Sequence, residues 1–137
     1  MKFNKFTIIV PTRNRASTVY HTLRTCLELD YSNFEVIVSD SFSQDNTKGV
    51  VDSFNDPRIK YFNTGKIVDL ASNWEFGLSQ VAETDFVTVL GDDDGILKDS
   101  LSQLNSILNE YQVSCVTWRK AEYSWPDHIA ESFRNYM

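Results

Sequence analysis

Short apolar runs alternate along this chain with segments in which apolar residues recur at helical spacing. Five short runs, rich in β-branched and aromatic side chains, predict strands. They cover residues 6–10, 34–39, 58–62, 86–90 and 113–118. Between them the spacing predicts helices over about 16–27, 46–54, 70–82 and 100–111. Strands and helices in this alternation form a mostly parallel sheet through right-handed crossovers. The pattern therefore predicts an α/β domain of Rossmann-like, three-layer α/β/α architecture, with helices on both faces.

Two of the predicted helices are amphipathic. In the helix over 70–82, one face carries Leu70, Trp74, Leu78 and Val81, and such a stripe ordinarily faces the core. The helix over 100–111 has the cleanest stripe. Beyond residue 119 the pattern fails, and the aromatic, polar tail predicts no element.

The stretch TDFVTVLGDDDGILKD, residues 84–99, concentrates the candidate chemistry. Its strand ends in a segment we call the acidic turn, residues 91–95, in which two glycines bracket Asp92, Asp93 and Asp94. Adjacent carboxylates repel one another, so such a cluster usually needs a cation, and hard oxygen ligands select Mg²⁺, Mn²⁺ or Ca²⁺. A solvated loop or a helix cap is the ordinary alternative. Asp99 is already placed to cap the next helix, which leaves the three acids for a metal site.

Polar residues also follow the first two predicted strands. PTRNR, residues 11–15, follows the first, and Asp40 ends the second. In an open parallel sheet, ligands bind at the carboxyl ends of the strands, so these residues can converge with the acidic turn. A carboxylate can accept a hydrogen bond from a base N–H or a sugar hydroxyl, and arginine offers a planar fork to phosphate or a base edge.

Composition narrows the function classes. A length of 137 residues and a hydrophobic fraction of 42% suit one domain with one core. The net charge of −6 argues against nucleic acid as a main partner, but not against a phosphorylated ligand beside a metal. No apolar run approaches the roughly 20 residues of a membrane helix. Cys26 and Cys115 lie in apolar stretches, which predicts buried free thiols and a reducing compartment.

Several common site motifs are absent from the sequence. No glycine-rich dinucleotide fingerprint follows the first strand, and there is no P-loop and no nucleophile elbow. His21 and His128 have no ligand partner at metal spacing, which favours packing or surface roles for both.

Three segments together resemble the amino-terminal half of a family 2 glycosyltransferase with the GT-A fold. They are FTIIVPTRNRASTVYHTLRTCL, FEVIVSDSFSQDNT and ASNWEFGLSQVAETDFVTVLGDDD. They are similar to the family's first strand, turn and helix, to its second strand and loop, and to its asparagine-containing helix, fourth strand and DxD metal motif. The resemblance implies a nucleotide-diphospho-sugar-binding GT-A core over residues 1–118. Residues 119–137 would begin a truncated acceptor-binding region.

The resemblance also implies roles by position. Asp92 and Asp94 would be the pair around a Mn²⁺ or Mg²⁺ ion and the sugar diphosphate, and Asp93 would contact the ribose or the donor sugar. Asp40 would bind the base, usually uracil, and Asn73 would face the donor. The remaining base and ribose contacts would come from Pro11, Thr12, Arg13 and Arg15.

The chain departs from the family pattern around the base rather than around the metal. Ser39 stands where the family usually has the first aspartate of a pair. Phe42 stands where it usually has glycine, so we expect that loop to take another path. The basic residue common before the helix asparagine is absent. Lys66 is a candidate substitute, with a plain exposed lysine as the alternative.

The leading hypothesis is a metal-dependent glycosyltransferase that transfers a sugar from a nucleotide-diphosphate sugar, UDP-linked, with inversion, to the hydroxyl of a saccharide or lipid-linked acceptor. The chain would be the donor-binding part, because Glu122, Asp127 and Glu131 offer no convincing catalytic base. The alternative is a nucleotide-binding module without catalysis. A flavodoxin-like signalling or phosphatase domain fits less well, because such folds place their aspartates after other strands. We expect a cytoplasmic protein, with a peripheral membrane position and self-association left open.

Overall fold

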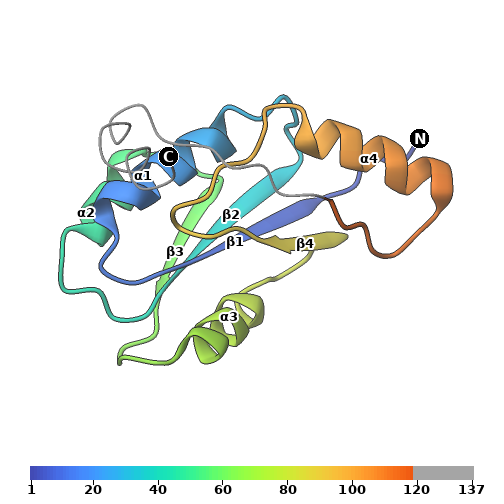
Figure 1. Cartoon of the computed structure of the whole chain (residues 1–137). Coiled ribbons are helices and arrows are strands. Elements are labelled where there is room, and N and C mark those ends of the chain that lie inside the picture. Colours follow the sequence, from blue (N-terminus) through green and yellow to red (C-terminus); the bar gives the residue numbers. More distant parts are fainter. Residues whose placement is uncertain (119–137) are drawn as a thin grey trace, which may run out of the picture.

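The structure is a computed structural model that describes residues 1–118. Within these residues, four strands alternate with four helices (Figure 1). The elements are β1 (Phe6–Thr12), α1 (Ala16–Leu27), β2 (Phe34–Asp40), α2 (Thr47–Ser53), β3 (Ile59–Asn63), α3 (Leu70–Ser79), β4 (Phe86–Val89) and α4 (Ser100–Tyr111). The predicted alternation is therefore confirmed as far as α4.

The four strands form one parallel sheet in the order β3-β2-β1-β4. The register places Thr12 beside Asp40, and Asp40 beside Asn63, so three strands end in one row. The strand order reverses at β1, which has β2 on one side and β4 on the other. The carboxyl ends of β1 and β4 therefore form the topological switch point at which such sheets bind ligands.

Helices cover both faces of the sheet, as the sequence predicts. In Figure 1, α1, α2 and α4 lie on one side and α3 lies on the other. The first side holds the main core, where strand residues such as Ile8 and Val36 pack with Leu23 of α1 and Leu101 of α4. Because both faces are covered, β1 and β2 are buried along their whole length. No helix in residues 1–118 is both long enough and apolar enough to cross a membrane.

α3 packs on the sheet through its polar and small residues instead of its apolar stripe. Asn73 is 3% exposed, and a Cβ added at Gly77 would lie 2.7 Å from Ile9 Cγ2, so the backbones approach closely there. The neighbouring apolar stripe is partly exposed, with Leu70, Trp74 and Leu78 exposed by 67%, 42% and 47%. The hydrogen bonds of Asn73 and the close approach at Gly77 fix this orientation against the hydrophobic pattern.

Residues 113–118 do not form the predicted fifth strand. α4 ends at Tyr111, and its C-cap residue Gln112 has a left-handed φ of 51°. The chain then continues without regular structure as far as Trp118. Within the described residues this segment pairs with no strand of the sheet. The prediction of two buried thiols is half right. Cys26 is buried, and burial raises its pKa to about 12, whereas Cys115 is exposed.

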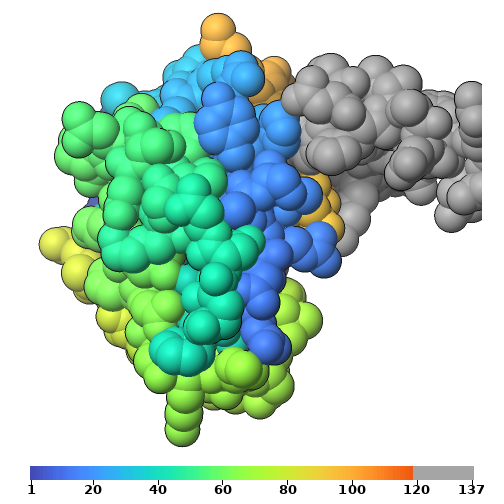
Figure 2. Space-filling model, turned by 90° about the vertical axis from the view of Figure 1, so that its left-hand side faces the viewer, coloured from blue at the N-terminus to red at the C-terminus, as the bar shows by residue number. Residues whose placement is uncertain are grey.

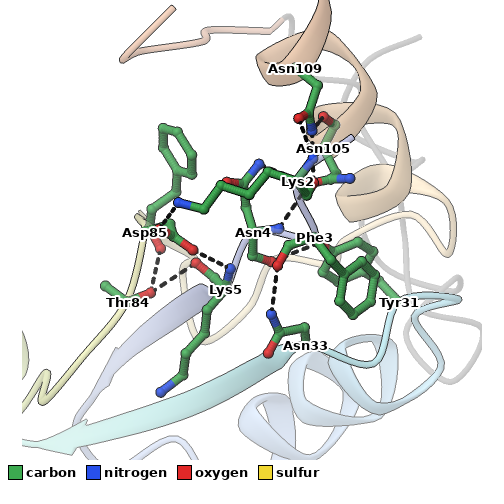
Figure 3. Close-up of polar contacts among 11 residues, drawn as sticks. Lys2, Phe3, Asn4, Lys5, Tyr31, Asn33, Thr84, Asp85, Asn105 and Asn109 are labelled. Atoms are coloured by element: carbon green, nitrogen blue, oxygen red, sulfur yellow. Dashed lines mark hydrogen bonds and ion pairs between the residues drawn. The ribbon is translucent and has the colours of Figure 1, made fainter. Parts of the chain in front are cut away.

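Side-chain amides hold the first residues of the chain against α4 (Figure 3). Asn109 accepts a hydrogen bond from the Lys2 amide at 2.7 Å and donates to the Lys2 carbonyl at 2.9 Å. One helical turn earlier, Asn105 Oδ1 accepts from the Asn4 amide at 3.1 Å. From the opposite side, Tyr31 donates to the Asn4 carbonyl at 2.6 Å. The start of the chain is thus bonded before β1 begins.

Candidate functional site

The end of β1 and the acidic turn meet at the switch point. Thr12 Oγ1 donates to Asp92 Oδ2 at 2.7 Å. Beyond the last residue of β4, the Leu90 amide still bonds to the Ile9 carbonyl at 2.9 Å, which keeps the two strand ends together. Two segments singled out separately in the sequence are therefore in direct contact, 80 residues apart along the chain.

The acidic turn is tight, and its first glycine makes room for two carboxylates. The Asp94 amide donates to the Gly91 carbonyl at 3.1 Å. A Cβ added at Gly91 would lie 2.6 Å from Asp94 Oδ2 and 3.3 Å from Asp93 Oδ1. The carboxylates of Asp93 and Asp94 thus fold back over Gly91, and any side chain there would displace them.

The environment of Asp92 disfavours its negative charge. Burial raises the pKa of Asp92, and the charge of Asp93 adds to this. The hydrogen bond from Thr12 and the positive charge of Arg15 oppose the shift without cancelling it. A carboxylate in this position gains stability from an added cation.

The donor set of the acidic turn fits a hard divalent ion held together with a ligand. All three side chains present carboxylate oxygens, which suit Mg²⁺ and Mn²⁺. Across residues 1–118, no group of three or more acidic, histidine or cysteine side chains could hold a metal by itself. Magnesium in nucleotide sites is usually bound by one or two carboxylates plus phosphate oxygens. The residues present fit that arrangement.

Arg15 brings positive charge to the edge of the acidic turn. Its Nη1 lies 3.5 Å from Asp93 Oδ2, and both side chains are about half exposed, at 52% and 54%. An exposed pair at this distance contributes little to stability. Arg15 can therefore exchange Asp93 for another anion at low cost. Arg13 is exposed on the same turn, whereas Pro11 is buried in β1.

The loop between β2 and α2, residues 41–46, is bonded along its length to the turn after β1. The Ser41 amide donates to the Thr12 carbonyl at 2.9 Å. The Asn14 amide donates to Ser43 Oγ at 2.8 Å, and Asn14 Oδ1 accepts from the Gln44 amide at 2.7 Å. Figure 2 shows this loop in turquoise beside the blue segment that leads into α1. The two loops form one unit that carries Arg13 and Arg15.

Asp45 caps two helices at once. Its Oδ1 accepts from the Thr47 amide of α2 at 3.0 Å, and its Oδ2 accepts from the Ala16 amide of α1 at 3.0 Å. Burial raises the pKa of Asp45, but the Thr47 hydroxyl and the backbone amides outweigh it, so the pKa lies below its ordinary value. The bond to α1 is not evident from the sequence, because it joins residues 29 apart.

Asp40 is fully buried and its carboxylate is occupied by protein groups. Oδ1 accepts from the Ser43 amide at 3.0 Å and from Ser43 Oγ at 2.6 Å. Oδ2 accepts from the Tyr61 hydroxyl and from Asn63 Nδ2. Burial raises the pKa of Tyr61 to about 12, and the negative charge of Asp40 adds to this effect. A base N–H would reach Asp40 only if one of these donors moved, so the base contact stays a prediction.

Asn73 joins α3 to the ends of β1 and β2. Its Oδ1 accepts from Ser39 Oγ at 2.7 Å, and its Nδ2 donates to the Ser39 carbonyl at 3.0 Å and to the Thr12 carbonyl at 3.4 Å. The Asn73 amide therefore bonds to the backbone of Thr12. Its contact with a sugar donor stays a prediction. Ser39, a departure from the family pattern, supplies the partner that Asn73 needs.

Phe42 and Lys66, at two further positions where the chain departs from the family pattern, are exposed. Phe42 has a φ of 55°, the left-handed conformation that glycine adopts readily. The loop therefore keeps a glycine-like backbone at this residue, with the ring 40% exposed. Lys66 is exposed in the loop before α3, as both of its alternative roles require.

Sequence reasoning missed two contributors to this edge. The alternation around Tyr61 predicts only a strand, although it places Tyr61 on the same face of that strand as Asn63, two residues on. The second group is two threonines of α1: Thr22 bonds to Asp94 in the acidic turn, and Thr25 bonds to Ile96 just after it. They lie within the resemblance, but their spacing of three on a helix gives no signal by itself.

Comparison with known proteins decides the family. The family model "Glycosyl transferase family 2" matches residues 7–132. This chain belongs to glycosyltransferase family 2. A Campylobacter jejuni GalNAc(5)-diNAcBac-PP-undecaprenol beta-1,3-glucosyltransferase is 40% identical over 109 residues, which are 77% of this chain and 35% of the relative. An Escherichia coli UDP-Glc:alpha-D-GlcNAc-diphosphoundecaprenol beta-1,3-glucosyltransferase is 29% identical over 107 residues, 78% of this chain and 42% of the relative.

Solved structures agree with this assignment. Staphylococcal (S. aureus) TarS 1-349 in complex with UDP-GlcNAc has a TM-score of 0.75 at 28% identity, over 79% of this chain and 32% of that one. The mannosyltransferase PcManGT from Pyrobaculum calidifontis, in complex with GDP-Man and Mn²⁺, has a TM-score of 0.69 at 26% identity, over 77% and 32%. The expected GT-A fold is confirmed. The chain spans between about a third and a half of the length of these relatives and structures.

Proposed function

We propose that this chain is the donor-binding part of a glycosyltransferase that uses a nucleotide-diphosphate sugar, with UDP as the nucleotide. The contact between Thr12 and Asp92 carries the proposal. It joins the turn that bears two arginines to three carboxylates at the switch point of a parallel sheet, where such folds bind ligands. The complex of TarS with UDP-GlcNAc supports UDP, and the complex of PcManGT with GDP-Man makes GDP the comparison to test.

We also propose that Asp92 and Asp94 hold Mn²⁺ or Mg²⁺. The crowded carboxylates and the raised pKa of Asp92 support this, and the Mn²⁺ in the PcManGT complex agrees with it. When bound, the ion would neutralise the diphosphate and stabilise it as a leaving group.

The chain's own residues would bind and orient the donor around this ion. Arg15 would exchange its exposed partner Asp93 for a phosphate oxygen, which leaves Asp93 free to accept from a hydroxyl of the ribose or sugar. Arg13 would lie against the base or the ribose. Asp40 and Asn73 would keep the strand ends in place, and Asp40 would accept from the base if Asn63 moved aside. The catalytic base of an inverting displacement would come from outside residues 1–118.

The acceptor we propose is a lipid-linked saccharide. Two relatives have names that contain an undecaprenol-linked diphosphate acceptor. Such an acceptor would require the enzyme to work at a membrane surface, on the cytoplasmic side where activated sugars are available.

The test is calorimetric titration of UDP into the chain with and without Mn²⁺, with GDP, CDP and dTDP as comparisons. We expect UDP to bind in the presence of Mn²⁺ and Asp94→Asn to weaken that binding at least about 10-fold. Asp99→Asn is the matched control, because Asp99 lies outside the acidic turn and is exposed.

Three outcomes would change the proposal. If GDP binds more tightly than UDP, the proposed nucleotide changes from UDP to GDP. If Asp94→Asn binds UDP and Mn²⁺ as the wild type does, Asp94 does not hold the metal. Binding of a diphosphate without sugar transfer or donor hydrolysis by the longest natural form of the protein would favour a non-catalytic nucleotide-binding module.

A further inference from the structure

Two threonines of α1 hold the end of the acidic turn. Thr22 Oγ1 donates to the Asp94 carbonyl at 2.7 Å. Thr25 Oγ1 accepts from the Ile96 amide at 3.1 Å and donates to the Thr22 carbonyl at 2.8 Å. The two hydroxyls therefore bind the peptide groups on either side of Gly95. Their spacing of three residues, about one helical turn, matches the two-residue step from Asp94 to Ile96.

These bonds oppose the force that would open the turn. Three adjacent carboxylates repel one another, and burial already disfavours the charge of Asp92. Thr22 is fully buried, at 0% exposure. Its hydroxyl therefore bonds to the Asp94 carbonyl at a position on α1 that solvent does not reach. Loss of that hydroxyl would leave the carbonyl without this partner.

The same bonds fix the backbone from which the carboxylate of Asp94 projects. The Asp94 amide is held by the Gly91 carbonyl and the Asp94 carbonyl is held by Thr22, so both peptide groups of this residue are bonded. Its side chain then folds back over Gly91 toward Asp93. α1 thus holds the backbone on either side of Gly95, and with it the positions from which the neighbouring carboxylates project.

We propose that Thr22 and Thr25 are positioning residues that hold Asp92–Asp94 in a cation-binding arrangement. The inference rests on the proposed function, because it concerns the same metal and diphosphate site. It adds that the affinity for the ion is set in part by hydroxyls on α1 that touch neither the ion nor the donor.

The experiment measures Mn²⁺ binding by electron paramagnetic resonance, in the presence of UDP, for the wild type and three variants. Thr22→Val keeps the shape and removes the hydroxyl, whereas Thr22→Ser keeps the hydroxyl. Thr18→Val is the matched control, because the Thr18 hydroxyl bonds to the carbonyl of the α1 N-cap residue, Arg15, at 3.3 Å and not to the acidic turn. We expect about 10-fold weaker Mn²⁺ binding for Thr22→Val and less than about 3-fold change for the other two.

A second readout separates positioning from a general loss of structure. Affinity for UDP without metal should be the same in Thr22→Val as in the wild type, because the proposed base and ribose contacts come from β1, β2 and their loops. Circular dichroism on each variant confirms that binding is measured on folded protein. If Thr22→Val does not fold, Thr25→Val takes its place with the same expected result.

The outcomes distinguish this inference from the proposed function. If Thr22→Val binds Mn²⁺ as well as the wild type does, the positioning role is overturned and the proposed function is not. Equal weakening in Thr22→Val and Thr22→Ser, or equal loss of metal-free UDP binding, also overturns it. Wild type that binds neither Mn²⁺ nor UDP overturns the proposed function and this inference together.

Discussion

Asp45 lies between the first residues of α1 and α2, and its carboxylate accepts from both helices. Because Arg15 directly precedes α1, the same carboxylate sets the direction in which the arginine-bearing turn enters the helix. A cap that serves two helices should cost more on removal than an ordinary cap, which is worth about 1 kcal/mol.

We predict that Asp45→Ala lowers the free energy of unfolding by about 1–2 kcal/mol at pH 7. The pKa of Asp45 is lowered in the folded protein, so its contribution is present above the unfolded pKa of about 3.9 and is lost as the pH falls through the folded pKa. The difference between wild type and Asp45→Ala should therefore shrink below about pH 4. Urea unfolding at several pH values measures it.

Asn46→Ala is the control for this prediction, because Asn46 occupies the N-cap position of α2 without a side-chain capping bond. It should change stability by less than about 0.5 kcal/mol at every pH. A wild-type advantage over Asp45→Ala that stayed constant down to pH 2 would show that the carboxylate charge is not involved.

At the scale of elements, the sequence predicts the four strands and the four helices well, because their apolar patterns are set by a core that covers both faces of the sheet. It misjudges α3, where the hydrophobic stripe is partly exposed. There a single buried amide, Asn73, and a single glycine, Gly77, decide the orientation, and neither contributes to a hydrophobic pattern. It also misjudges residues 113–118, because a short apolar run carries no information about whether a partner strand exists.

The orientation of α3 can be tested with two substitutions on neighbouring residues. Leu78 is 47% exposed, so Leu78→Ser should change the free energy of unfolding by less than about 1 kcal/mol. Gly77→Ala should cost about 1–3 kcal/mol although alanine favours helix, because the new methyl group would lie 2.7 Å from Ile9 Cγ2 and 3.2 Å from Ser39 Cβ. Urea unfolding gives the loss in the free energy of unfolding for each variant, which should be larger for Gly77→Ala than for Leu78→Ser. The reverse order would mean that the apolar stripe faces the sheet.

At the scale of the whole molecule, the candidate site was predictable in outline and not in its supports. The three polar segments at the strand ends meet where a parallel sheet requires them to meet. The bonds that hold them come from pairs far apart in sequence, such as Thr22 with Asp94 and Asp45 with Ala16. Such pairs depend on how helices lie over the sheet, which a single sequence does not specify.

Bonds between residues far apart in sequence also hold the opposite end of the sheet, where α4 binds the start of the chain. Asn105 is 5% exposed, and its Oδ1 accepts from both the amide and the side chain of Asn4, 101 residues away. Asn105→Ala would leave a buried backbone N–H without this partner, so we predict a loss of about 1–3 kcal/mol in the free energy of unfolding.

Asn109 is the matched comparison for Asn105, because it makes the equivalent contact to Lys2 nearer the surface. Asn109→Ala should cost less than Asn105→Ala, because water can replace a partner at the surface. Amide hydrogen exchange at Asn4 should accelerate in Asn105→Ala, while UDP binding in the presence of Mn²⁺ should not change, because the site lies at the other end of the strands. If both variants were as stable as the wild type, α4 would be held by its apolar stripe alone, and the amide pair would add nothing to stability.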